Sequence, residues 1–138
     1  MRRIVLDTNV LVSALRSRRG TSNRLVSLVG SETFELVISV PLVLEYEDAA
    51  LRQIDALVYT PDEVREIIDF LCWAGEAKPI YYLWRPFLPD PKDDLVLEAA
   101  VAGRCDTIVT FNQRDFKGVD KFGLQARTPR AFLEELET

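Results

Sequence analysis

Short apolar segments alternate with helix-like segments along this chain, and that alternation limits the folds open to it. The run Arg3-Ile4-Val5-Leu6 is too short for a helix, and it lacks the alternating polar residues of a half-exposed strand. Similar strand candidates follow at 35–38, 79–83, 107–110 and 124–127. Strands buried on both faces and separated by helices form a mostly parallel sheet with helices on each side. The sequence therefore predicts a three-layer α/β/α domain with a five-stranded, mostly parallel sheet.

Capping residues and glycines mark the expected helix ends. Thr60-Pro61 combines a cap with a proline at the first helical position, and Glu63 completes a capping box for a helix that Gly75 ends. Thr128-Pro129 starts the last helix in the same way. The other helices are expected at 10–15, 22–29, 39–51 and 93–102. The chain shows no internal repeat or linker, so its 138 residues are expected to form a single domain, 1–138.

The composition excludes several kinds of site. The chain has no histidine, which rules out Ser-His-Asp and Cys-His triads and imidazole zinc sites. Its two cysteines, Cys72 and Cys105, lack the spacing of a zinc or redox motif and are expected in the core of a reduced protein. The opening MRRIVLDTNVL reaches an aspartate too early for a signal peptide, and no apolar run approaches membrane-spanning length. We therefore expect a cytoplasmic protein with no membrane partner.

The charge distribution leaves a nucleic-acid partner possible. A net charge of −5 is unusual for a protein that binds phosphates. The first 24 residues, however, contain six arginines and the single acid Asp7. Net charge alone therefore does not decide the question.

Several acids fall where an open α/β sheet binds its ligands, outside the carboxyl ends of the strands. Asp7 ends the first strand candidate, and Asn112 and Asp115 follow the fourth. Glu45 and Asp94 lie in helical context and could reach the same crevice. Carboxylates that converge without histidine or cysteine suit a hard cation such as Mg²⁺ or Mn²⁺.

Each of these residues also has an ordinary structural explanation. Asp7 could cap the helix that follows it, and Glu45 could lie on a solvated helix face. Asp93 could be an N-cap, with Asp94 a first-turn acid favoured by the helix dipole. The polar residues after the fourth strand are common turn formers.

Taken together, the segments resemble a known family. Val5-Leu6-Asp7-Thr8-Asn9-Val10-Leu11 resembles the opening strand-to-helix signature of PIN-domain ribonucleases, which include the VapC-type toxins of toxin–antitoxin modules. Three further segments resemble the family in the same order: the Glu45 helix after Ser39, Asp94–Ala100 and Ile108–Phe116. The ending Thr128–Leu133 resembles the PIN subgroup described as toxin components. The resemblance spans the whole chain and implies a PIN-like domain.

The resemblance also implies roles for particular residues. Asp7, Glu45 and Asp94 become the central metal-binding and catalytic acids. Asp94 is preferred to Asp93 because Leu97, Ala99 and Ala100 then fall at small and apolar positions of the family's helix.

The fourth position of the implied metal site is open between two residues. Many relatives have an aspartate where Asn112 stands, and others have an asparagine followed three residues later by an acid, as Asp115 is here. An asparagine coordinates without adding charge, so a second metal ion could bind weakly. Thr8 and Asn9 would orient Asp7 and its waters, and Thr110 would have a similar role.

The implied reaction is metal-dependent hydrolysis of RNA with Mg²⁺, or Mn²⁺, as cofactor. Arg16, Arg18, Arg19 and Arg114 would hold the RNA backbone, although a solvated basic loop explains the first three equally well. By resemblance, the partners are RNA, a cognate antitoxin and a second copy of the chain.

Two other functions compete with this interpretation. One is a PIN-like RNA-binding or adaptor module whose change at the fourth acid has weakened catalysis. The other is a phosphohydrolase or phosphoacceptor domain with Asp7 as a covalent nucleophile. Against the second, Asn9 stands where aspartyl phosphohydrolases have another aspartate.

Overall fold

The computed structural model describes residues 1–80 and 87–137, and within them a single five-stranded sheet. The pairings between neighbouring strands are all parallel, in the order β3-β2-β1-β4-β5. The strands are β1 (Arg2–Leu6), β2 (Phe34–Ile38), β3 (Glu76–Ala77), β4 (Thr107–Val109) and β5 (Gln125–Arg127). The predicted sheet is confirmed.

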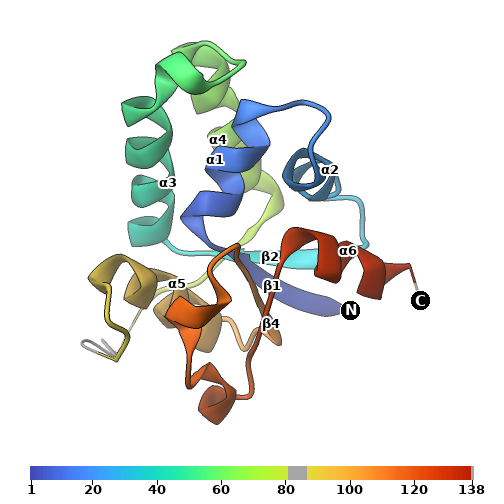
Figure 1. Ribbon diagram of the computed structural model, residues 1–138, viewed down its shortest axis with the longest axis vertical. Coiled ribbons are helices and arrows are strands. Elements are labelled where there is room, and N and C mark those ends of the chain that lie inside the picture. The colour runs from blue at the N-terminus through green and yellow to red at the C-terminus, as the bar shows by residue number, and fades with distance from the viewer. Residues whose placement is uncertain (81–86, 138) are drawn as a thin grey trace.

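Helices cover both faces of this sheet. They are α1 (Thr8–Arg16), α2 (Thr21–Ser27), α3 (Val40–Arg52), α4 (Pro61–Ala74), α5 (Pro91–Ala102) and α6 (Pro129–Leu136). Short 3₁₀ helices lie at η1 (Ile54–Ala56), η2 (Gln113–Phe116) and η3 (Val119–Phe122). Figure 1 shows α1 to α4 on one side of the sheet and α5 on the other, and α6 packs beside α2. The predicted three-layer α/β/α architecture is therefore confirmed.

The central strand β1 is buried as its apolar sequence predicts. Ile4, Val5 and Leu6 are fully buried, and β1 pairs with β2 on one side and β4 on the other. The ladder extends one residue beyond the strand, because the Asp7 N–H donates to the Val109 carbonyl at 2.9 Å. This bond fixes Asp7 at the carboxyl edge of the sheet.

The helix starts read from capping residues are confirmed for α4 and α6. Thr60 Oγ1 accepts from the Glu63 N–H at 3.2 Å, and Glu63 Oε1 accepts from the Thr60 N–H at 2.9 Å. Thr128 Oγ1 accepts from the Ala131 N–H at 3.1 Å. Each helix has a proline at its start, as the sequence pattern predicts.

Three local expectations differ from the structure. The third strand lies at Glu76–Ala77 instead of 79–83, because Pro79 has no N–H with which to continue the ladder; residues 81–83 lie outside the described residues. Helix α5 begins at Pro91 instead of Asp93, with Asp90 as its cap. Cys105 is buried as expected, whereas Cys72 is exposed on α4.

Among the described residues, no helix has the length and apolarity to cross a bilayer.

Candidate active site

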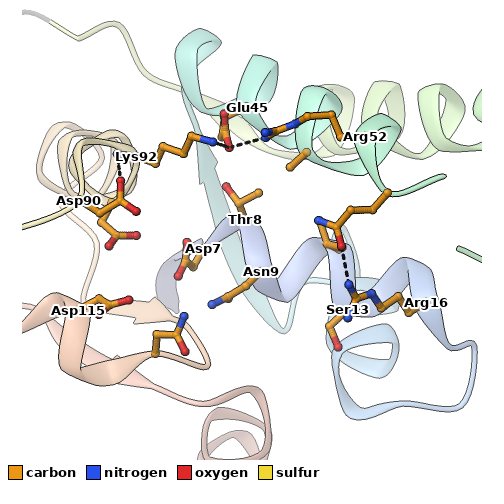
Figure 2. Close-up of a pocket in the computed structure, with 15 residues that line it drawn as sticks. Asp7, Thr8, Asn9, Ser13, Arg16, Glu45, Arg52, Asp90, Lys92 and Asp115 are labelled. Atoms are coloured by element: carbon orange, nitrogen blue, oxygen red, sulfur yellow. Dashed lines mark hydrogen bonds and ion pairs between the residues drawn. The ribbon is translucent and has the colours of Figure 1, made fainter. Parts of the chain in front are cut away.

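A pocket of about 340 Å³ opens at the carboxyl ends of β1 and β4. The chain leaves β1 towards β2 on one side and reaches β4 on the other, so the strand order reverses here. Figure 2 shows the side chains that surround the pocket. The charged or amide side chains in its lining are Asp7, Asn9, Arg16, Glu45, Arg52, Gln53, Asp90, Lys92, Asp93, Asn112 and Asp115.

Asp7 is held at the floor of the pocket by the strand ends. It occupies the cap position of α1, but beyond Thr8 its carboxylate does not make the usual capping hydrogen bond with the first turn of that helix. Instead Oδ2 accepts from the Thr110 hydroxyl at 2.7 Å, and Asp7 is only 6% exposed. Burial raises its pKa, against the lowering effect of the Thr110 and Thr8 hydrogen bonds, and the charges of Asp115 and Asp90 raise it further.

Thr110 joins the loop after β4 to Asp7. Its hydroxyl donates to Asp7 and accepts from the Asn112 N–H at 2.9 Å. The Asp115 N–H in turn donates to the Asn112 carbonyl at 3.0 Å. Through these bonds the loop places Asn112 and Asp115 at the pocket, beside the end of β1.

Glu45 reaches the pocket from α3, on the far side from Asp115 (Figure 2). The next residue, Tyr46, is fully buried and donates its hydroxyl hydrogen bond to the Leu6 carbonyl, which attaches α3 to the end of β1. The Glu45 side chain is 13% exposed, and its Oε1 lies 3.6 Å from Lys92 Nζ and 3.7 Å from Arg52 Nη2. Glu45 is thus a partly buried carboxylate between two cations, not a solvated helix residue.

The structure places Asp93 in the pocket and Asp94 behind it. Burial, followed by the charges of Asp7, Asp90, Asp115 and Asp94, raises the pKa of Asp93 to about 7.

Asp94, which the resemblance implied as the third metal-binding acid, lies outside the pocket lining. Asp94 is fully buried, and its Oδ1 accepts from the Leu88 N–H at 3.0 Å. Its Oδ2 has no hydrogen-bond partner among the described residues. The apolar register could not separate the two acids because α5 is buried on most of its surface, including Leu97, Ala99 and Ala100.

The donors around the pocket suit a hard divalent cation, because carboxylate and amide oxygens are the ligands that Mg²⁺ prefers. The side chains are spread around the pocket as they stand. Within residues 1–80 and 87–137, no three acidic or cysteine side chains lie close enough to hold one ion. Glu45 in particular is engaged by Lys92 and Arg52 (Figure 2).

Of the arginines predicted to hold RNA, Arg16 lines the pocket. Arg18 lies 4.8 Å from the ring centre of Tyr59 and donates to a loop carbonyl at 3.3 Å. Arg18, Arg19 and Arg114 are exposed and outside the pocket lining.

Sequence reasoning missed the three other charged residues of the pocket, Arg52, Lys92 and Asp90. Arg52 follows Glu45 by seven residues, the spacing that returns to the same helix face. The Asp90-Pro91 pair has the same cap-and-proline pattern that marked two other helices. Reading it in that way would have placed Asp90 and Lys92 at the start of α5.

Comparisons with known proteins agree with this architecture. A family model described as PIN domain matches residues 3–114. VapBC2 from Rickettsia felis, solved bound to a DNA fragment from its promoter, is similar in structure with a TM-score of 0.60 and 17% identity, covering 90% of this chain and 98% of that chain.

A second solved structure, VapBC-1 from nontypeable Haemophilus influenzae, has a TM-score of 0.61 and 16% identity, covering 93% and 98% of the two chains. No curated protein matches the sequence significantly. At these identities the solved structures show a shared fold, and the family model covers most of the chain. The chain therefore belongs to the PIN domain family, with a VapC-like fold.

Proposed function

We propose that this protein is a metal-dependent endoribonuclease that hydrolyses phosphodiester bonds of RNA. The observation that supports it most is the pocket at the strand reversal of a PIN domain, where five acids line one opening and the chain has no histidine. Such a donor set has no imidazole base. It suits chemistry in which carboxylates hold Mg²⁺ or Mn²⁺.

In this proposal Asp7, Glu45, Asp93 and Asp115 hold the metal, with Asn112 as a neutral ligand. A divalent ion held there would activate water for attack and would offset the charge that develops on the phosphate. The Thr110 hydroxyl keeps Asp7 oriented and favours its ionised form.

Asp93 replaces Asp94 as the third metal ligand, because Asp93 lines the pocket and Asp94 does not. Asp94 instead positions the segment before α5 through its bond with the Leu88 N–H. That segment carries Asp90, which begins the helix on which Asp93 and Lys92 stand. Asn9 and Thr8 line the pocket next to Asp7, as an orienting role requires.

We further propose a biological setting. The chain would be the toxin of a bacterial or archaeal toxin–antitoxin module, acting on RNA in the cytoplasm as a dimer and silenced by a cognate antitoxin. Two solved proteins of similar fold are VapBC assemblies, which supports an antitoxin partner. Arg16 at the pocket rim is suited to contact an RNA phosphate.

A second candidate is a PIN-like RNA-binding module with weakened catalysis. One observation favours it: the described acids do not converge on a single ion position, and the fourth position holds a neutral Asn112. Such a module would bind RNA at saturating metal without cutting it.

One assay separates the candidates. The chelator-treated protein is incubated with structured and single-stranded RNA in Mg²⁺, Mn²⁺ or excess EDTA, and the products are separated by gel. The endonuclease proposal predicts internal cleavage that requires metal and disappears with EDTA. RNA binding without cleavage in both metals would instead support the adaptor.

A further inference from the structure

Two cations from different helices contact the same oxygen of Glu45. Lys92 stands in the first turn of α5, and Arg52 is the last residue of α3. Their nitrogen atoms lie 3.6 Å and 3.7 Å from Glu45 Oε1. Figure 2 shows Glu45 between them at the pocket wall, away from Asp7.

These contacts are long and partly solvated, so they are easily exchanged. Both cationic side chains are 54% exposed, whereas that of Glu45 is 13% exposed. Ion pairs of this kind contribute little to stability, because solvent screens them. Arg52 also has a second anchor, Asp48 at 3.1 Å. Releasing Glu45 would therefore cost little.

The pocket contains both signs of charge. Asp7 and Asp115 lie on one side and Arg52 and Arg16 on the other, while Lys92 reaches from beside Asp90 towards Glu45 (Figure 2). A divalent cation at Glu45 would take the oxygen that Lys92 and Arg52 share and would repel them both. A phosphate at the pocket would attract them.

We propose that Lys92 and Arg52 form a phosphate-binding pair that occupies Glu45 until a divalent cation takes that carboxylate. The released pair then binds a backbone phosphate of the RNA. This inference rests on the proposed ribonuclease function and adds the residues that receive the substrate. It also makes metal binding and RNA binding mutually supportive. The metal displaces the pair from Glu45, and a bound RNA phosphate keeps the pair from returning to that carboxylate.

The pair therefore has opposite effects on the two ligands. Without Lys92, the metal no longer competes for Glu45 and binds more tightly, whereas RNA loses one phosphate contact. A purely structural role predicts no such divergence. Both side chains are more than half exposed, so their truncation is expected to leave the fold intact.

The test uses Lys92→Met and Arg52→Met in the full chain. Arg65→Met is the matched control, because Arg65 is a similarly exposed cation on α4 paired with an acid at 3.4 Å. Calorimetric titration of the metal-free proteins with Mn²⁺, in the absence of RNA, should show about two- to fivefold tighter binding for Lys92→Met. Arg52→Met should follow in the same direction with a smaller change, and Arg65→Met should match the wild type.

RNA binding is then measured with a single-stranded oligonucleotide in Ca²⁺, with a gel check that the RNA stays intact. Lys92→Met should bind several-fold more weakly, and its salt dependence should fall by about 0.7 in logarithmic slope, the value of one lost phosphate contact on a single strand. Lys92→Arg should retain RNA binding, because it keeps the charge.

Unchanged or weaker Mn²⁺ binding by Lys92→Met would overturn the pair, as would an unchanged RNA affinity and salt slope. Wild-type cleavage distinguishes this result from failure of the proposed function. If Lys92→Met shifts the metal and RNA affinities in opposite directions but the wild type does not cleave RNA, the phosphate-binding pair is supported and the ribonuclease function is rejected. If the wild type cleaves RNA but Lys92→Met shifts neither affinity, the ribonuclease function is supported and the pair is rejected. If none of the proteins binds Mn²⁺, both proposals are rejected.

Discussion

At the amino ends of the strands, carboxylates pair with arginines, whereas at the carboxyl ends Asp7 and Asp93 are buried near other carboxylates. Arg2 in β1 contacts Asp106 at 2.8 Å and Glu135 at 2.9 Å. Arg3, also in β1, pairs with Glu35 of β2 and lies 2.8 Å from Glu76 of β3. The amino edge is therefore crossed by ion pairs from the central strand to its neighbours.

The pKa values follow this difference in surroundings. Burial alone would raise the pKa of Asp106, but hydrogen bonds from the Arg3 N–H and the Arg2 guanidinium lower it. Burial of Glu135 is likewise outweighed by Arg2 and Arg127, so that its pKa is lowered. At the carboxyl edge, burial and the surrounding carboxylates raise the pKa of Asp7 and of Asp93.

Carboxylates thus have a different role at each edge of the sheet. The amino edge favours ionised carboxylates and stabilises the sheet. The carboxyl edge holds carboxylates whose repulsion a bound cation would relieve, which is the usual electrostatic pattern of a functional site. The predictions below perturb each edge in turn.

The largest effect is expected from Asp7→Asn at the carboxyl edge. Loss of a metal-binding carboxylate should reduce metal-dependent RNA cleavage by about 10³-fold or more, or ~4 kcal/mol in activation free energy. The metal-free fold should be at least as stable as the wild type, because repulsion with Asp115 and Asp90 falls. Rate assays and thermal unfolding in EDTA measure the two effects. The control is Asp69→Asn, which changes an exposed acid on α4. Full activity in Asp7→Asn would show that Asp7 is not part of the metal site.

At the amino edge, Arg2→Met should destabilise the fold by about 2–3 kcal/mol. It removes bonds to Asp106, Glu135 and the Thr107 hydroxyl, and a cation–π contact 5.0 Å from the ring centre of Phe132. Urea unfolding gives the free energy, and cleavage by the folded fraction should not change.

The free energy of unfolding of Arg2→Lys should lie between those of the wild type and Arg2→Met, since lysine keeps the charge but lacks the planar guanidinium group. Arg65→Met breaks an exposed ion pair on another helix and should lower the free energy of unfolding by less than about 0.5 kcal/mol. A loss for Arg2→Met as small as that for Arg65→Met would show that the amino edge is not a stabilising network.

The pH dependence of stability should reveal Asp93. Its pKa is about 7 in the folded protein and 3.8 in an unfolded chain, so the folded state binds the proton more tightly. The stability that this proton gives is complete below pH 3.8 and is lost as pH rises through 7. In EDTA, Asp93→Asn should therefore gain about 1–2 kcal/mol over the wild type at pH 8, after allowance for solvent screening, and nothing at pH 4.

Urea unfolding at pH 4, 6 and 8 tests this difference between variant and wild type. Asp69→Asn should show no such pH-dependent gain. An equal gain at all three pH values would mean that the charge of Asp93 is not the cause.

The fold was largely predictable because local signals agreed with burial. The apolar run of β1 and the Thr60 and Thr128 caps are short-range patterns, and the structure confirms them. The third strand was misplaced because a two-residue strand depends on pairing with β2 and leaves no pattern of its own. Its end is set by Pro79, a signal that the apolar pattern of the following residues obscured.

The site was predictable in its location and less so in its helix register. Asp7 and the loop after β4 follow from strand ends, which any parallel sheet brings to one edge. Asp93 and Asp94 adjoin on a helix buried nearly all round, so hydrophobic periodicity could not choose between them. The contacts of Lys92 and Arg52 with Glu45 join two helices far apart in the sequence, and only the assembled fold reveals them.

The smallest effect, and the finest test of the carboxyl edge, concerns Asn112. It lines the pocket beside Asp115 and contributes no charge there. Affinity for hard cations rises with the number of charged oxygen ligands, so Asn112→Asp should tighten Mn²⁺ binding by about three- to fivefold, or less than ~1 kcal/mol. Asp115→Asn should weaken binding, though less than Asp7→Asn does. Calorimetric titration of these variants measures each change, and unchanged affinity in both Asn112→Asp and Asp115→Asn would place this loop outside the metal shell and leave a site of three carboxylates.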